Sequence, residues 1–144
     1  MGFLLCGNPA VATDGTYYAG ADMTRVSAIS CPDNLTFDAR GNLWIATDGQ
    51  PGTIRVNDGI FAVPVDGPDR GYLRQFLSGP AGAEVTGPEF TPDNSTLFCS
   101  IQHPGEGGTL ASPTSRWPNG GSSFARASVV AVYKAAPGPK TVGT

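Results

Sequence analysis

The stretch CPDNLTFDARGNLWIATDG, residues 31–49, decides the fold, because it reads as two strands joined by a tight turn. Apolar and polar residues alternate in LTFD, and an apolar strand pattern resumes in LWIAT. The intervening ARGN ends in Gly41 and Asn42, two residues that suit a tight hairpin turn. The sequence therefore predicts a β-hairpin, preceded by a Pro-Asp-Asn group that is either a turn or a metal-binding element.

Strand patterns recur along the chain, whereas helical spacing of apolar residues is scarce. Strand-like segments occupy residues 59–65, 72–78, 95–102 and 127–134, and residues 103–123 form a long loop rich in Gly, Ser and Pro. The chain has 20 glycines and 13 prolines among 144 residues, which fits short strands separated by many turns. We therefore predict an all-β fold of antiparallel sheets.

A similarity between two segments of the chain extends this prediction. DNLTFDARGNLWIATDG can be laid over PEFTPDNSTLFCSIQHPG, so that Asn34 falls on Glu89 at a separation of 55 residues and Leu43 on Leu97 at 54. Repeats of ~40–50 residues with several strands each are typical of propeller blades, although two hairpins can also resemble each other by chance. The length suffices for about two to three blades, so we predict a partial β-propeller with bare sheet edges that could pair with another copy.

Composition and charge exclude several classes of function. The net charge is −3 and no basic run occurs, so nucleic acid is not an expected partner. No segment approaches the ~20 apolar residues needed to span a membrane. Three cysteines cannot all pair within the chain, their spacing matches no zinc motif, and we expect Cys99 to be a buried, inert thiol.

Asp33, Asn34 and Glu89 are the candidate metal ligands. Carboxylate and amide oxygens are hard ligands that suit calcium, and equivalent positions of adjacent blades would face one central axis. Asp33 and Asn34 also suit an ordinary turn, because their side chains can bond to the nearby backbone. Glu89 lies between Pro and Phe and has no turn role, which favours the metal interpretation.

Four other polar residues could carry chemistry. Asp48 and Asp58 each precede a glycine, and we interpret both as structural turn residues. His103 opens the long loop and could serve as a ligand or a general base, but the sequence shows no partner for it. Glu106 lies in the same loop, and its role is equally open.

Four segments in order resemble the C-terminal part of the PhoX family of bacterial alkaline phosphatases. They are FLLCGNPA, CPDNLTFDARGNLWIATDG, GAEVTGPEFTPDNSTLFCSIQHPGEG and RWPNGGSSFARASVVAVYK, and they cover nearly the whole chain. The resemblance implies a six-bladed propeller that holds calcium and iron at its centre, hydrolyses phosphate monoesters and is exported through the twin-arginine pathway to the periplasm or beyond. It also implies that Asp33 and Glu89 are metal ligands, with Asn34 close by.

The resemblance further implies that this chain supplies only part of a site. We expect residues 1–136 to form C-terminal blades of a longer phosphatase, residues 137–144 to form a flexible tail, and the isolated chain to be inactive. The catalytic residues remain unassigned, and a homo-oligomer through exposed strand edges is a further expectation. Two alternatives stay open: a non-catalytic propeller that serves as a binding or scaffold module, and a calcium-dependent propeller lactonase.

Overall fold

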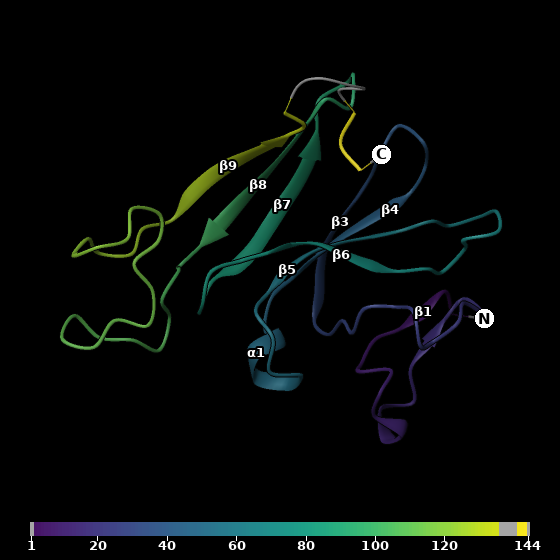
Figure 1. The fold of residues 1–144 in the computed structure, drawn as a ribbon, viewed down its shortest axis with the longest axis horizontal. Helices are drawn as coiled ribbons and strands as arrows, with labels where there is room; N and C mark the ends of the chain where they lie inside the picture. Colours follow the sequence, from purple (N-terminus) through teal and green to yellow (C-terminus); the bar gives the residue numbers. More distant parts are fainter. Residues whose placement is uncertain (1, 136–140, 144) are drawn as a thin grey trace.

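The computed structural model describes residues 2–135 and 141–143 and is built almost entirely of β-strands (Figure 1). The strands are β1 (Leu4–Leu5), β2 (Tyr17–Tyr18), β3 (Pro32–Phe37), β4 (Leu43–Thr47), β5 (Gly59–Val63), β6 (Arg74–Ser78), β7 (Glu84–Phe90), β8 (Thr96–Gln102) and β9 (Ser128–Tyr133). Two short helices, η1 (Ala12–Asp14) and α1 (Gln50–Thr53), complete the described elements. Within these residues, no helix has the length and hydropathy required to cross a bilayer.

The strands form three antiparallel sheets. Strands β3 to β6 pair in sequence order, β7 to β9 do the same, and β1 pairs with β2. The β7–β9 sheet packs beside the β3–β6 sheet, and the long loop after β8 projects away from both (Figure 1). No sheet closes into a barrel within the described residues. The predicted all-β, antiparallel fold is confirmed, and the two consecutive meanders are the blades of a partial propeller.

Asp38 fixes the predicted hairpin between β3 and β4. Its carboxylate is buried, and Oδ1 accepts the backbone N–H groups of Arg40 and Asn42, each at 2.9 Å. Oδ2 accepts the Asn42 side-chain amide at 2.8 Å and the Trp44 indole N–H at 3.1 Å. Gly41 has a φ of 81°, which a residue with a Cβ adopts only at a cost. The hairpin is thus held by side chains that are local in sequence.

Strand pairing corrects the alignment of the two hairpins. Thr36 pairs with Trp44, and Glu89 pairs with Phe98, so the counterpart of Glu89 is Thr36. The sequence alignment instead placed Glu89 on Asn34, two residues earlier. The difference arises because the second hairpin loop is one residue longer than the first, whereas the alignment assumed that it is one residue shorter.

The main core lies between the two large sheets. Trp44 is 1% exposed, and its ring meets those of Phe76 and Phe90 edge-on, with centroids 4.9 and 5.0 Å away. Cys99 belongs to this core, as predicted, and burial raises the pKa of its thiol to about 11. Its other buried members are Ala46, Ile60, Ala83, Val85, Leu97, Ile101 and Val142. This apolar layer sets the relative position of β4 and β7.

The N-terminal segment covers the opposite face of the β3–β6 sheet. Tyr18 and Ile29 are fully buried there against Ile45, Phe61 and Leu73. Burial raises the pKa of the Tyr18 hydroxyl to about 12, helped by the nearby Cys6 thiol. The sequence did not predict β1 and β2, because strands of two residues are too short to show an alternating pattern.

Most of the predicted tail, residues 137–140 and 144, lies outside the described residues. The described part, residues 141–143, lies against the two hairpin loops. Val142 is 4% exposed, and its N–H donates to the Asn94 carbonyl at 2.9 Å. Arg40 Nη2 donates to the Gly143 carbonyl at 2.9 Å. These contacts place the segment over the edge of the main core.

Candidate functional site

Asn34 lies where the first strands of the two large sheets meet. Its Oδ1 accepts the backbone N–H of Gly87 at 2.9 Å and the Thr86 hydroxyl. The pairing of β7 with β8 shifts between Thr86 and Glu89, which marks a β-bulge. The bulge frees the Gly87 N–H from the ladder and turns it toward β3. Asn34 thus joins the two sheets through an amide oxygen that already has two donors.

Asp33 and Glu89 lie on strands β3 and β7, the two strands that meet at this junction. Both carboxylates are exposed, and neither has a hydrogen-bond partner in the part of the chain that the structure describes. Glu89 is directly opposite Phe98, so it shares the sheet face that is turned away from the main core. The structure therefore brings Asn34 to β7 and leaves both carboxylates exposed to solvent.

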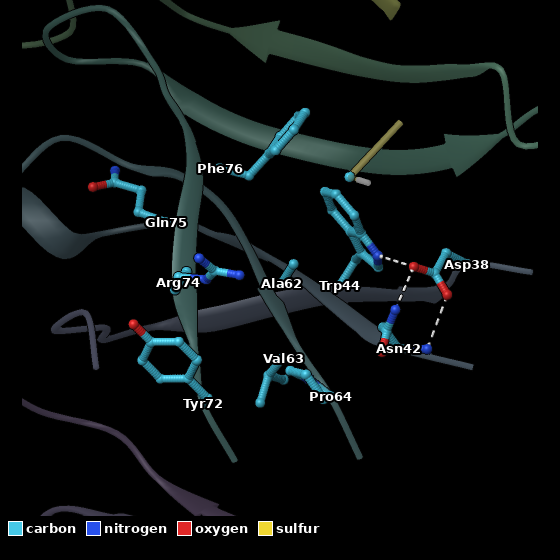
Figure 2. A pocket seen from close by; sticks show the side chains of 11 residues that line it. Asp38, Asn42, Trp44, Ala62, Val63, Pro64, Tyr72, Arg74, Gln75 and Phe76 are labelled. Atoms are coloured by element: carbon cyan, nitrogen blue, oxygen red, sulfur yellow. Dashed lines mark hydrogen bonds between the residues drawn. The ribbon is translucent and has the colours of Figure 1, made fainter. Parts of the chain in front are cut away.

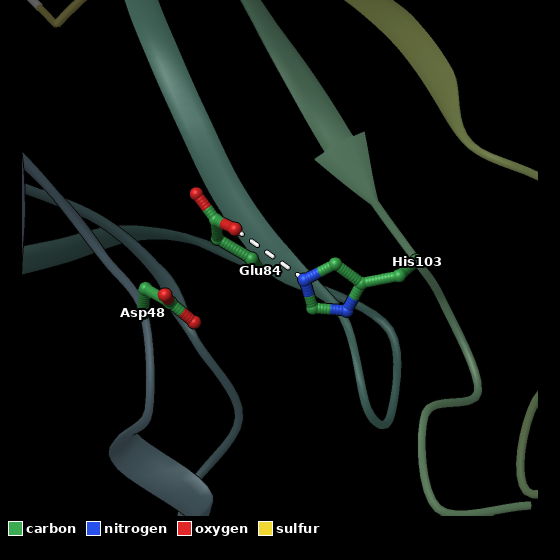
Figure 3. A group of neighbouring side chains, drawn as sticks. All are labelled: Asp48, Glu84 and His103. Carbon is green, nitrogen blue, oxygen red and sulfur yellow. Dashed lines mark hydrogen bonds and ion pairs between the residues drawn. The ribbon is translucent and has the colours of Figure 1, made fainter.

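A different group of potential ligands converges between the sheets (Figure 3). Asp48, Glu84 and His103 each offer a donor atom, and these atoms all lie within 4.8 Å of one another. Nε2 of His103 is 3.3 Å from Oε2 of Glu84, which is largely buried. Asp48 follows β4, Glu84 begins β7, and His103 follows β8. Both sheets therefore contribute to one cluster of two carboxylates and one imidazole.

Backbone contacts around Asp58 explain the position of Asp48. The buried Asp58 carboxylate accepts the N–H groups of Gly49 and Gln50, each at 3.0 Å, at the start of α1. Asp58 is therefore structural, as predicted. The N–H of Asp48 donates to the Cys31 carbonyl at 3.1 Å, while its own carboxylate has no hydrogen-bond partner within the described residues. Its side chain points toward Glu84 and His103 (Figure 3).

His103 is held between two carboxylates. Besides Nε2, which faces Glu84, its Nδ1 lies 3.6 Å from Oε2 of Glu106. Burial lowers the pKa of His103, but the hydrogen bond to Glu84 and the charges of Glu106 and Glu84 outweigh it, and the pKa is raised above its ordinary value. The sequence showed no partner for His103, and the fold supplies two from different segments.

Trp44 also lines a hollow of about 260 Å³ that lies over β5 and β6 (Figure 2). Asp38 lines it, but both oxygens of its carboxylate are engaged by the hairpin. Burial raises the pKa of Asp38, and the hydrogen bonds from Asn42, Trp44 and Arg40 lower it further than burial raises it, so the net pKa is below the ordinary value. This carboxylate stabilises the fold and is not free to act on a ligand.

Two comparisons with known proteins point to the same family. The family described as Alkaline phosphatase PhoX matches residues 2–105, which is most of the chain. The chain belongs to the PhoX family. A solved structure, Pseudomonas fluorescens PhoX in complex with vanadate, a transition state analogue, is 36% identical in sequence and has a TM-score of 0.66. That match covers 90% of this chain and 22% of the Pseudomonas chain, and no curated protein matches the sequence.

The predicted PhoX relationship is confirmed, but the cluster in Figure 3 was missed. In the sequence, Asp48 has the pattern of a turn residue because a glycine follows it. Nothing in the segment GAEVTG marks Glu84 as a potential ligand. Asp48 and Glu84 are 36 positions apart in the sequence, and only the packing of two sheets brings them together. His103 was the one available signal, as the chain's single histidine at the end of an apolar strand.

Proposed function

We propose that this PhoX-family chain forms part of a metal-dependent alkaline phosphatase that hydrolyses phosphate monoesters. The family match over residues 2–105 is the observation that carries the proposal. The Pseudomonas PhoX structure supports it, because that protein was captured with vanadate, a transition state analogue. Since this chain spans 22% of the Pseudomonas chain, the substrate and the activity belong to a larger assembly of blades.

Asp33 and Glu89 are the proposed metal ligands within this chain. Both carboxylates are exposed and have no hydrogen-bond partner among the described residues, so they are available as the hard oxygen donors that calcium prefers. The amide oxygen of Asn34 already accepts two hydrogen bonds, so Asn34 holds β3 against β7 beside the ligands. Bound cations, calcium with iron, would neutralise the phosphate charge and activate the attacking oxygen.

The same proposal makes the isolated chain inactive. Asp33 and Glu89 are two donors from two blades, and a cluster of cations needs more ligands than these, which would come from elsewhere in the ring. We further propose that the complete phosphatase is exported by the twin-arginine pathway and acts in the periplasm or outside the cell. Self-association of the isolated chain would cover its exposed sheet edge.

The test uses the complete phosphatase that contains this segment. We expect Asp33→Asn and Glu89→Gln, numbered as here, to lower phosphomonoesterase activity by at least about 100-fold, because each removes a ligand charge while keeping side-chain size. Calcium content, measured by elemental analysis after dialysis, should fall in both variants. Asp66→Asn is the control, since Asp66 is an exposed carboxylate in the β5–β6 loop.

Two results would overturn this assignment. If both variants keep full calcium content and activity, Asp33 and Glu89 are not ligands. If the 144-residue chain alone hydrolyses a chromogenic phosphate monoester at the rate of the complete enzyme, the site is not shared among blades. The first result concerns the ligands and the second concerns the distribution of the site, so the two failures are distinguishable.

A further inference from the structure

The cluster in Figure 3 has the donor chemistry of a transition-metal site. It combines one imidazole nitrogen with two carboxylate groups, and all three donor atoms lie within 4.8 Å of one another. In a tetrahedral zinc site, metal–ligand bonds of ~2.0–2.1 Å place neighbouring donor atoms roughly 3.3 Å apart. The distance of 3.3 Å between His103 Nε2 and Glu84 Oε2 already equals this spacing between donor atoms. The third donor, Asp48, has an exposed carboxylate that can approach by rotation of its side chain.

The surroundings of His103 favour a metal ligand. Its Nε2 is directed at Glu84, while its Nδ1 lies 3.6 Å from Oε2 of Glu106. A carboxylate on the second ring nitrogen is the usual arrangement around metal-bound histidine, because it fixes the tautomer and makes the first nitrogen a better donor. The backbone of Glu106 is held in place, since its N–H donates to the Gly82 carbonyl at 3.0 Å, while its carboxylate is exposed.

We propose that Asp48, Glu84 and His103 bind a divalent transition-metal cation of the zinc class, with Glu106 as the carboxylate that orients His103. Imidazole favours zinc over calcium or magnesium, whereas the two carboxylates supply charge. Three protein ligands leave room for water at a fourth position. The site does not include Asp33 or Glu89, so it is independent of the ligands proposed for the phosphatase reaction.

A cation here would connect the two blades. Asp48 comes from the end of β4 in one sheet, and Glu84 and His103 come from β7 and β8 in the other. The cation would therefore cross-link the sheets at the end where β7 begins, opposite the hairpin loops. Because such a cation binds only the assembled sheets, its presence should raise the temperature of unfolding.

The test measures zinc binding to the tag-free 144-residue chain by isothermal titration calorimetry. We expect one zinc ion per chain, and at least about tenfold weaker binding in Asp48→Asn and in His103→Gln. Asp48→Asn is the informative variant, because Asp48 is exposed and makes no side-chain hydrogen bond within the described residues, so the fold should persist. Glu106→Gln should weaken binding by about tenfold while all three ligands remain.

Matched controls separate this site from its alternatives. Asp33→Asn removes a proposed calcium ligand, and Cys31→Ser removes a partly exposed thiol that could itself bind zinc; each should change the zinc affinity by less than about twofold. Excess calcium should not displace the zinc. The proposal is overturned if the folded chain binds no zinc, or if Asp48→Asn and His103→Gln bind it as tightly as the unaltered chain. Circular dichroism verifies that each variant is folded.

Discussion

Asn34 Oδ1 accepts the backbone N–H of Gly87 at 2.9 Å, and this hydrogen bond joins the first strand of one sheet to the first strand of the next. The bulge in β7 exposes this N–H, and the Thr86 hydroxyl adds a second donor to the same oxygen. The apolar core sets the distance between the sheets, whereas this polar contact specifies which residues of β3 and β7 lie side by side.

Replacing Asn34 with alanine should destabilise the junction. The change removes the acceptor of the exposed Gly87 N–H and the half-buried Thr86 hydroxyl, and a typical hydrogen bond contributes about 0.5–1.5 kcal/mol. We expect a loss of this size in the free energy of unfolding, measured by urea titration with chelator present. Asp33→Ala is the control, because its exposed side chain has no partner in the described structure and should change the stability by less than about 0.5 kcal/mol. Equal losses in both variants would contradict this role of Asn34.

The stabilisation by Asp38 should depend on pH. The pKa of Asp38 is lower in the folded chain than its ordinary value, because hydrogen bonds from Asn42, Trp44 and Arg40 outweigh the effect of burial. Ionised Asp38 therefore stabilises the fold fully above the unfolded pKa of about 4, and the contribution disappears as the pH falls through the lower folded pKa. At pH 7, Asp38→Ala should lose about 2–3 kcal/mol of stability.

The measurement compares Asp38→Ala with the unaltered chain by urea unfolding at pH 7, 5 and 3, with far-ultraviolet circular dichroism as the signal. The difference between the two proteins should be constant from pH 7 to 5 and smaller at pH 3. A difference that grows on acidification would mean that the protonated carboxyl is the stabilising form. Asp66→Ala, an exposed control outside the hairpin, should show little difference at any of these pH values.

Gly71 is a position where a side chain cannot be accommodated. Its φ is +81°, and a Cβ there would overlap the backbone carbonyl of Tyr18, which belongs to the N-terminal segment. Gly71→Ala should therefore destabilise the chain by more than about 3 kcal/mol and loosen the segment from its sheet. Gly67 has a similar φ of +69° but open space around it, so Gly67→Ala should cost only about 1 kcal/mol.

Thermal unfolding followed by circular dichroism compares these two glycine variants. Limited proteolysis reports on the N-terminal segment separately, because a detached segment is cleaved before the sheets unfold. If the two variants unfold at the same temperature and with the same proteolytic pattern, the close approach to Tyr18 does not determine stability. The pair separates the backbone cost of a positive φ, which both share, from the steric overlap, which only Gly71 has.

The parts of the fold that sequence predicted are those held by local contacts. The hairpin of residues 31–49 depends on Asp38, Gly41 and Asn42, all within five positions, and these residues carry the turn pattern. Cys99 was correctly predicted to be buried because it lies in the apolar run STLFCSI, residues 95–101. The family motifs identified PhoX for the same reason, since they are continuous segments.

The candidate sites were harder to predict because they depend on contacts between distant segments. Asn34 accepts a hydrogen bond from Thr86, which is 52 positions away in the sequence. No local sequence pattern predicts the bulge that exposes the Gly87 N–H. The sequence alignment of the two hairpins matched the correct strands, but its register was shifted by two residues. It therefore assigned the wrong counterpart to Glu89. Ligand residues at different strand ends, as in Figure 3, become neighbours only after two sheets have packed.

The outer face and edge of the β7–β9 sheet should drive self-association of the isolated chain. Strand β9 pairs only with β8 among the described strands, and Val129 and Tyr133 are 72% and 70% exposed beside Phe98. An unpaired edge flanked by exposed apolar side chains recruits another strand. Val129→Lys should weaken association about tenfold, because burying a valine contributes roughly 1.5 kcal/mol. Val11→Lys, at an exposed valine of the N-terminal segment, should leave it unchanged. Sedimentation equilibrium measures both, and an unaltered chain that stays monomeric at every concentration would show that this edge does not pair.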